Sequence, residues 1–170
     1  MEKEKVLFNA TLVFVENTEG KVLLGVKARK IGAGCWNGYG GGIEPNETPE
    51  QSALRGLDEE SGIKGDPSQL EKCGVVIFNN TKEDGKEFVC KMHVYFLRNT
   101  TAEVSTTEEM LTPKWFDKNK LPYNNMMPAD KDWVPYVMRG EKIQAEAWYG
   151  PFQKTLLKPT EIQVVKELHL

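Results

Sequence analysis

Carboxylate side chains gather in one short segment of the sequence, and their spacing suggests a metal site. Glu47 precedes a predicted helix, whereas Glu59 and Glu60 fall in its last turn. The helix macrodipole disfavours anions at that end by a few tenths to about 1 kcal/mol, so this pair needs compensation. Arg55 lies four residues before Glu59 and can pair with it across one turn. A hard divalent cation would also compensate, because Mg²⁺ prefers a few carboxylates combined with water and phosphate oxygens.

The acidic run by itself also fits a solvated helix face that follows a glycine-rich turn, without any metal. The wider spacing favours the metal site. Glycine, carboxylate, arginine and aliphatic residues recur at fixed intervals, at Gly41, Glu47, Arg55, Leu57, Glu59, Glu60, Gly62 and Ile63. This long gapped pattern resembles the signature of the Nudix hydrolases.

The resemblance implies hydrolysis of a diphosphate linkage that depends on Mg²⁺, with Mn²⁺ as an alternative cation. The metal ligands that it implies are Glu59, Glu60 and the main-chain carbonyl of Gly41. The catalytic residues that it implies are Glu60, Glu109 and Arg55. Either of the two glutamates in that set is a candidate general base, and the sequence does not choose between them.

Gly56 departs from the signature, which has a glutamate directly after the arginine. That glutamate is usually a metal ligand in the family, so its replacement puts the number of metal ions and the rate of catalysis in doubt. Glycine inside a helix also costs about 1 kcal/mol relative to alanine. We expect a metal site to survive on the remaining ligands.

Matches outside the signature extend over most of the chain and include residues 21–27 and 32–41. They resemble the branch of the family that hydrolyses oxidised purine nucleoside triphosphates. In that branch a lysine approaches the phosphates and an asparagine reads the base, which implies these roles for Lys27 and Asn37. The other base-binding residues that we expect are Asp130, Phe78 and Trp133.

The expected reaction is hydrolysis of a nucleoside triphosphate, with an oxidised purine as the candidate base, to the monophosphate and pyrophosphate. Such a reaction sanitises the nucleotide pool. Ala129 stands where the branch has a base-reading acid, so base recognition is expected to be weakened or redirected. Two alternatives therefore stay open: a Nudix hydrolase of another nucleoside diphosphate derivative, and a nucleotide-binding relative with weak catalysis.

The elements that must position these residues follow from local patterns. Residues 6–15 and 21–26 predict a hairpin with a break at 16–20. Thr48 and Gln51 form a capping-box pattern and Gly62 can end the helix, which predicts a helix over 49–61.

Later segments predict strands over 74–78 and 88–97, separated by a polar turn over 79–86. A second helix is expected from about Asp130 to just before Gly140, despite Pro135. Residues 145–152 and 162–168 read as late strands, although the last segment could be helical. The fold class expected is α/β: a Nudix fold in which helices sandwich a mixed β-sheet, over a single domain of residues 1–170.

Composition limits the partners. The formal net charge of −3 gives no reason to expect binding to nucleic acid or to an anionic membrane. The three cysteines, Cys35, Cys73 and Cys90, are too widely spaced for a zinc site and are expected to be buried free thiols. No leader pattern or long apolar stretch is present, so we expect a cytoplasmic protein that acts on a small nucleotide. The oligomeric state stays open.

Overall fold

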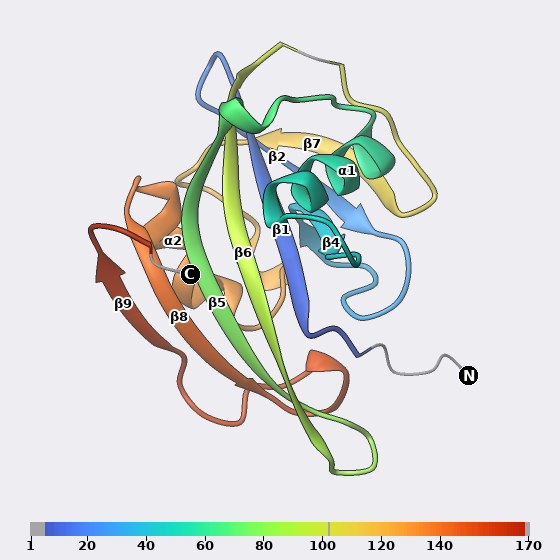
Figure 1. Ribbon diagram of the computed structural model, residues 1–170, viewed down its shortest axis with the longest axis vertical. Helices are drawn as coiled ribbons and strands as arrows, with labels where there is room; N and C mark the ends of the chain where they lie inside the picture. Colours follow the sequence, from blue (N-terminus) through green and yellow to red (C-terminus); the bar gives the residue numbers. More distant parts are fainter. Residues whose placement is uncertain (1–5, 102, 169–170) are drawn as a thin grey trace.

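A curved mixed β-sheet lies between two helices in the computed structural model, which describes residues 6–101 and 103–168 except the side chain of Asn99 (Figure 1). Over these residues the sheet has nine strands. They are β1 (Asn9–Asn17), β2 (Val22–Lys27), β3 (Trp36–Asn37), β4 (Tyr39–Gly42), β5 (Leu70–Thr81), β6 (Glu87–Thr100), β7 (Met110–Phe116), β8 (Lys142–Tyr149) and β9 (Glu161–Val165). The two α-helices are α1 (Pro49–Ser61) and α2 (Asp130–Met138). The expected α/β class and mixed sheet are confirmed.

The sheet combines parallel and antiparallel neighbours. Its main path runs β3-β2-β1-β6-β5-β8-β9, while β4 pairs with β1 and β7 pairs with β2. The pairs β1–β6 and β5–β8 are parallel, and the other pairs are antiparallel. Because β1 pairs with both β2 and β4, the sheet divides there and leaves room for a cavity beside β1.

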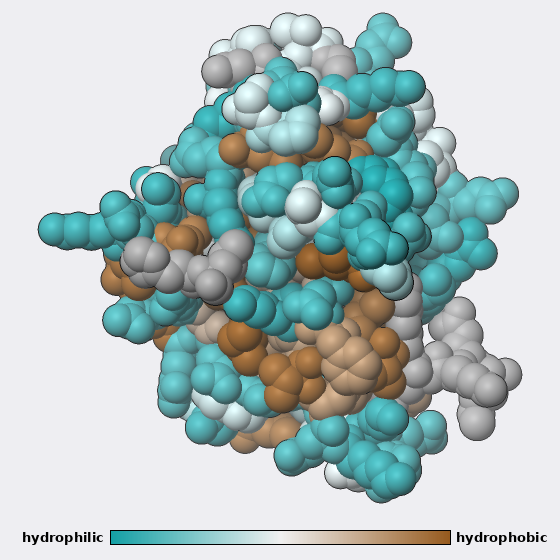
Figure 2. Space-filling view, in the orientation of Figure 1, coloured by the Kyte–Doolittle hydropathy of each residue, from teal (hydrophilic) through white to brown (hydrophobic). Residues whose placement is uncertain are grey.

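Each face of the sheet packs against one helix, because side chains alternate along the central strand β1. Leu12 and Phe14 join the core on the α2 side, where Phe14 lies 6.2 Å from the Trp133 ring. Val13 and Val15 join the core on the α1 side, which includes Leu57. Helix α1 covers only part of its face: Figure 2 shows hydrophilic side chains over α1 and hydrophobic ones still visible lower on the same side.

Helix α1 has the bounds and caps that the sequence predicts. The Gln51 N–H donates to Thr48 Oγ1 at 3.1 Å, and the Thr48 N–H donates to Gln51 Oε1 at 2.9 Å. Gly62 ends the helix with a left-handed φ of 77°. The predicted second helix is also confirmed as α2, with Pro135 inside it.

Several other predicted bounds are wrong. Asn79 and Asn80 were expected in a turn, but they continue β5 because its ladders with β6 and β8 bond their backbone. Strand β8 begins at Lys142 and ends before Gly150, while β1 starts only at Asn9. The late strand predicted over 162–168 is confirmed as β9, which ends earlier, at Val165, and the helical alternative is excluded.

All three cysteines are free thiols, as expected. Cys73 and Cys90 are buried, but the prediction of a buried thiol is wrong for Cys35, which lies half-exposed in a loop. No helix in the described part of the chain is both long enough and apolar enough to cross a lipid bilayer.

Candidate active site

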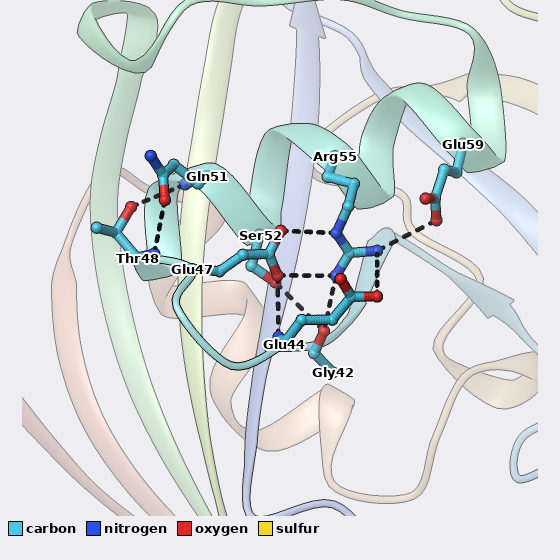
Figure 3. A network of polar contacts seen from close by, with 8 residues as sticks. All are labelled: Gly42, Glu44, Glu47, Thr48, Gln51, Ser52, Arg55 and Glu59. Atoms are coloured by element: carbon cyan, nitrogen blue, oxygen red, sulfur yellow. Dashed lines mark hydrogen bonds and ion pairs between the residues drawn. The ribbon is translucent and has the colours of Figure 1, made fainter.

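Arg55 ties the loop before α1 to the helix (Figure 3). Its Nε and Nη2 donate to the two carboxylate oxygens of Glu47 at 2.7 and 2.9 Å. Nη2 also donates to the Gly42 carbonyl at 3.0 Å, and Nη1 pairs with Glu59 at 3.2 Å. These contacts lower the pKa of Glu47 to about 2, chiefly through the hydrogen bonds from Arg55. Arg55 is therefore a positioning residue in this arrangement, and it does not line the cavity described below.

Glu60 turns from the last turn of α1 towards β4. Its Oε1 accepts the Gly40 N–H at 2.8 Å, and its main-chain carbonyl accepts the Thr107 hydroxyl at 2.9 Å. The pKa of the Glu60 carboxyl is raised to about 7, chiefly by burial; Glu109 and Glu59 contribute to the rise, while the Gly40 N–H and Lys27 oppose it. Such a desolvated carboxylate is stabilised by any cation that reaches it.

Two glycines allow close packing around β4, Gly40 against β1 and Gly56 between α1 and β4. A Cβ on Gly40 would lie 2.0 Å from the Thr11 carbonyl oxygen, which excludes every other residue there. A Cβ on Gly56 would lie 3.3 Å from the Cα of Gly40, a tight contact that small shifts can accommodate. Gly56 precedes Glu60 by one turn, so both positions face β4. Gly56, which stands in place of the signature glutamate, thus has a packing role that the sequence alone did not reveal.

A cavity of about 240 Å³ brings most of the predicted residues together. The predicted residues that line it are Lys27, Asn37, Gly41, Glu60, Phe78, Glu109, Asp130 and Trp133. Arg55 and Glu59 lie outside this lining. We call Lys27, Gly41, Glu60 and Glu109 the acidic end of the cavity, and Phe78, Asp130, Trp133 and Tyr149 its aromatic end.

Asp130 is the charged group of the aromatic end. It is 6 % exposed, and its Oδ2 accepts the Met127 N–H at 3.2 Å. Burial raises the pKa of this carboxyl to about 7. The Trp133 indole N–H is near enough to favour the Asp130 anion, yet it makes no hydrogen bond of normal geometry within the described residues. A buried donor and a buried acid on one cavity wall suit a polar ligand.

Tyr149 contributes to the cavity wall beside Ala129. Its hydroxyl oxygen accepts the Ala129 N–H at 2.8 Å, and its ring lies 5.8 Å from that of Phe78. Asn37 contributes from β3, where its Oδ1 accepts the Gly38 N–H at 2.9 Å. The amide nitrogen of Asn37 therefore remains available to donate a hydrogen bond to a ligand.

Sequence reasoning missed several lining residues, including Thr11, Arg29, Asn80, Tyr149 and Gln153. Thr11 is 2 % exposed and its Oγ1 has no hydrogen-bond partner among the described residues. Arg29 pairs with Glu109 at 3.2 Å. Only Arg29 carried a signal, because it belongs to a basic loop next to Lys27. The others come from strands and a turn whose meeting no local pattern encodes.

The acidic end fits a cation that keeps much of its shell as water and ligand oxygens. Within the described residues, no three acidic, histidine or cysteine side chains are grouped closely enough to hold a metal ion by themselves. The exposed Glu59 carboxylate is engaged by Arg55, which leaves the desolvated Glu60 carboxylate as the main candidate for an anionic ligand. Mg²⁺ commonly binds proteins through one or two carboxylates in this way.

Comparisons with known proteins agree with this geometry. The model of the NUDIX domain family matches residues 6–137. Proteins called oxidized purine nucleoside triphosphate hydrolase, from Danio rerio and Mus musculus, are 39 % and 36 % identical over 133 residues, which cover 78 % of this chain and 81 % of each relative. RNA pyrophosphohydrolase of Pseudomonas putida is 38 % identical over 61 residues, 36 % of this chain.

Solved structures show the same fold. A MutT protein from Bacillus halodurans has a TM-score of 0.75 at 22 % identity, covering 92 % of this chain and 97 % of that one. A MutT protein from Methanosarcina mazei has a TM-score of 0.65 at 23 % identity, covering 82 % and 98 %. The resemblance expected from the signature is confirmed, and this chain belongs to the Nudix hydrolase family.

Proposed function

We propose that this Nudix hydrolase cleaves purine nucleoside triphosphates, with oxidised purines as the preferred bases, to the monophosphate and pyrophosphate. The observation that carries the proposal is that one continuous cavity is lined both by a desolvated glutamate, Glu60, and by the aromatic end. The two animal relatives named above, which act on oxidised purine nucleotides by name, support the choice of substrate. Such an enzyme would clear damaged nucleotides from the cytoplasmic pool.

The proposed cofactor is Mg²⁺, for which Mn²⁺ would substitute. Family membership supports a divalent cation, and the Glu60 carboxylate with the Gly41 carbonyl would hold it, assisted by Glu59 once that side chain leaves Arg55. When bound, the ion supplies charge neutralisation at the phosphates and makes water more acidic.

The residues of the acidic end divide the remaining work. A water attacks phosphorus, the bond to the leaving pyrophosphate oxygen breaks, and the water proton goes to a carboxylate. Glu109, positioned by Arg29 at 3.2 Å, would take this role, because the Glu60 carboxylate would be occupied by the cation. Lys27 would neutralise the phosphates.

The proposed base contacts use the aromatic end. Phe78 and Trp133 would pack against the base, while Asn37 and Asp130 would bond its polar edge. An acid with a pKa near 7 can serve as donor or acceptor there, so Asp130 can follow the tautomer of the base.

The decisive experiment is pyrophosphate release from oxidised and unmodified nucleoside triphosphates, with Mg²⁺, with Mn²⁺ and with a chelator. We expect metal-dependent release that is fastest with an oxidised purine. Release from none of these nucleotides, or equal release with the chelator present, would refute the proposal.

A second candidate function is nucleotide binding with weak catalysis, which Gly56 favours because it removes one carboxylate beside Glu60. The variant Gly56→Glu tests it, since a carboxylate one turn before Glu60 would reach the same site. A rise of about 100-fold from a nearly inert parent would support the second candidate. Robust turnover by the unmodified chain would reject it. A third candidate, cleavage of another nucleoside diphosphate derivative, rests on Ala129 and would appear as activity on nucleoside diphosphate sugars in the same panel.

A further inference from the structure

A pair of amide side chains lies on the cavity wall. Gln153 Nε2 donates to Asn80 Oδ1 at 2.9 Å, and both residues line the cavity. Asn80 is 5 % exposed and is the register partner of Tyr149, in a wall that is otherwise largely aromatic. The Gln153–Asn80 bond satisfies one polar atom of each amide, which offsets the cost of burying it, and the second polar atom of each stays accessible from the cavity.

Strand registers place the amide pair far from the acidic end. Glu60 bonds Gly40 of β4, which is level, across β1, with Val94 of β6. Asn80 is level with Phe88 of β6. Six residues of β6, or roughly 20 Å of strand, therefore separate the two levels. A ligand with its phosphates beside Glu60 would present to the amide pair the part of the molecule farthest from those phosphates.

An uncommon backbone conformation directs Gln153 over the sheet. Phe152 and Gln153 have left-handed φ values of 59° and 54°, a conformation that costs a non-glycine residue roughly 1–2 kcal/mol. The turn is fixed by main-chain bonds: the Gln153 N–H donates to the Gly150 carbonyl at 3.1 Å, and the Gly150 N–H donates to the Thr155 carbonyl at 2.9 Å. Strain that the structure maintains around one cavity-lining side chain is typical of binding sites.

The amide pair presents one donor and one acceptor that the protein does not use. After the Gln153–Asn80 bond, the Asn80 amide nitrogen and the Gln153 carbonyl oxygen have no hydrogen-bond partner among the described residues. Turning both amides end for end leaves the same combination, so the conclusion does not depend on their assignment. Trp133, 1 % exposed on the same cavity, has an unpaired indole N–H as well. These groups indicate a ligand that brings its own donor and acceptor.

We propose that the Asn80–Gln153 amide pair reads the edge of a purine base that points away from the sugar. This inference rests on the proposed function and makes it more specific. Side-chain amides match a base edge on which a donor adjoins an acceptor. In a purine nucleotide that edge is the six-membered ring at N1 and C6. The pair thus selects purines with a polar substituent at C6 over those without one.

The test compares two triphosphates that differ at this edge, inosine 5′-triphosphate and purine riboside 5′-triphosphate. The ratio of their kcat/KM values is measured for the parent and for Asn80→Leu and Gln153→Met. We expect the parent to favour inosine 5′-triphosphate, and each variant to reduce that preference about tenfold, mainly through KM. Gln153 is half-buried in a surface turn, so its variant keeps the test valid if Asn80→Leu does not fold.

Asn79→Leu is the matched control. Asn79 is the adjacent residue of β5, points to the opposite face and donates to Glu146 at 2.7 Å. We expect this variant to keep the parental ratio. An unchanged ratio in both Asn80→Leu and Gln153→Met, or an equal loss on both nucleotides, would overturn the inference. If the parent hydrolyses neither nucleotide, the proposed function fails, but the ratio of their binding constants, measured by calorimetry, tests the amide pair in the same way.

Discussion

The two ends of the cavity are built in different ways. Two of the four residues of the acidic end, Gly41 and Glu60, come from one continuous stretch, β4 and α1, and are nineteen residues apart, whereas Lys27 ends β2 and Glu109 precedes β7. The aromatic end takes Phe78 from β5, Tyr149 from β8, and Asp130 and Trp133 from α2, positions that span 78 to 149. Gly41 and Glu60 belong to the family signature, from which Gly56 departs, whereas Ala129 and the amide pair lie beside Tyr149 of the aromatic end.

This difference separates chemistry from selectivity. The acidic end depends on the close backbone contact of the neighbouring Gly40 with Thr11, where no other residue fits, and on the charges of its own side chains. The aromatic end is formed by side chains on a stable sheet, where exchanging one side chain leaves the backbone in place. We expect changes at the acidic end to abolish folding or turnover, and changes at the aromatic end to alter which base is accepted.

The largest effect is expected for Gly40→Ala. Its Cβ would lie 2.0 Å from the Thr11 carbonyl oxygen, so β4 must leave β1 and carry α1 with it. We expect a loss of about 4 kcal/mol or more in the free energy of unfolding, measured by denaturant titration. Gly41→Ala is the control for stability, because its Cβ meets nothing within 4 Å. Equal stability of the two variants would contradict the packing described for Gly40.

Glu60→Gln is expected to reduce kcat by roughly 10²–10⁴-fold while the protein stays folded. The change keeps the shape of the side chain but removes the charge that would bind the cation. The measurement is pyrophosphate release at saturating Mg²⁺, with Glu44→Gln as control. Glu44 is exposed and lies 3.8 Å from Arg55, so its loss should change the rate less than twofold. Retention of parental activity by Glu60→Gln would exclude Glu60 from the cation site.

The pH dependence of stability should reveal the buried acid of the aromatic end. The pKa of Asp130 is raised to about 7 in the folded protein, so between pH 4 and 7 the folded state holds a proton that the unfolded state has lost. Stability from this group therefore falls as pH rises through that window, by a total on the order of 4 kcal/mol. Asp130→Asn should reduce the slope of the profile measured by thermal unfolding, and the remaining slope should come from Glu60, whose pKa is also raised to about 7. An unchanged profile in that variant would show that Asp130 ionises normally.

Arg55→Ala is expected to cost about 2 kcal/mol of stability. It leaves Glu47, which is 15 % exposed, without its bidentate partner and releases the Gly42 carbonyl. Turnover should fall as well, because Arg55 holds residues 42–47 against α1, the helix that carries Glu60. Lys in place of Arg55 keeps the charge but not the fork of donors, so it should recover only part of the loss. Full recovery by Arg55→Lys would mean that charge alone matters.

Gly56→Ala should have the smallest effect, within about 1 kcal/mol. The gain in helix propensity is about 1 kcal/mol, and the contact of the new Cβ with Gly40 at 3.3 Å opposes it. Thermal unfolding and turnover are both measured. A loss as large as that of Gly40→Ala would show that α1 and β4 cannot separate even slightly.

The sequence determined the locally encoded parts of this protein. The caps at Thr48 and Gly62 fix the two ends of α1, and its register fixes which residues face β4. Hence the helix bounds, the Arg55–Glu59 pair and the family could be predicted from neighbouring residues alone. The helix bounds and the Arg55–Glu59 pair depend on contacts between residues that are close in the sequence, and the family was identified from a pattern within one short segment.

Tertiary structure alone decided the rest. Asn80 looked like a turn residue until pairing with β6 and β8 extended β5 through it, and Gln153 reaches it only through a left-handed turn. The raised pKa values of Glu60 and Asp130 come from burial, which depends on the whole fold. Side chains distant in the sequence become neighbours because the sheet brings separate strands together, and no local pattern records which ones will meet.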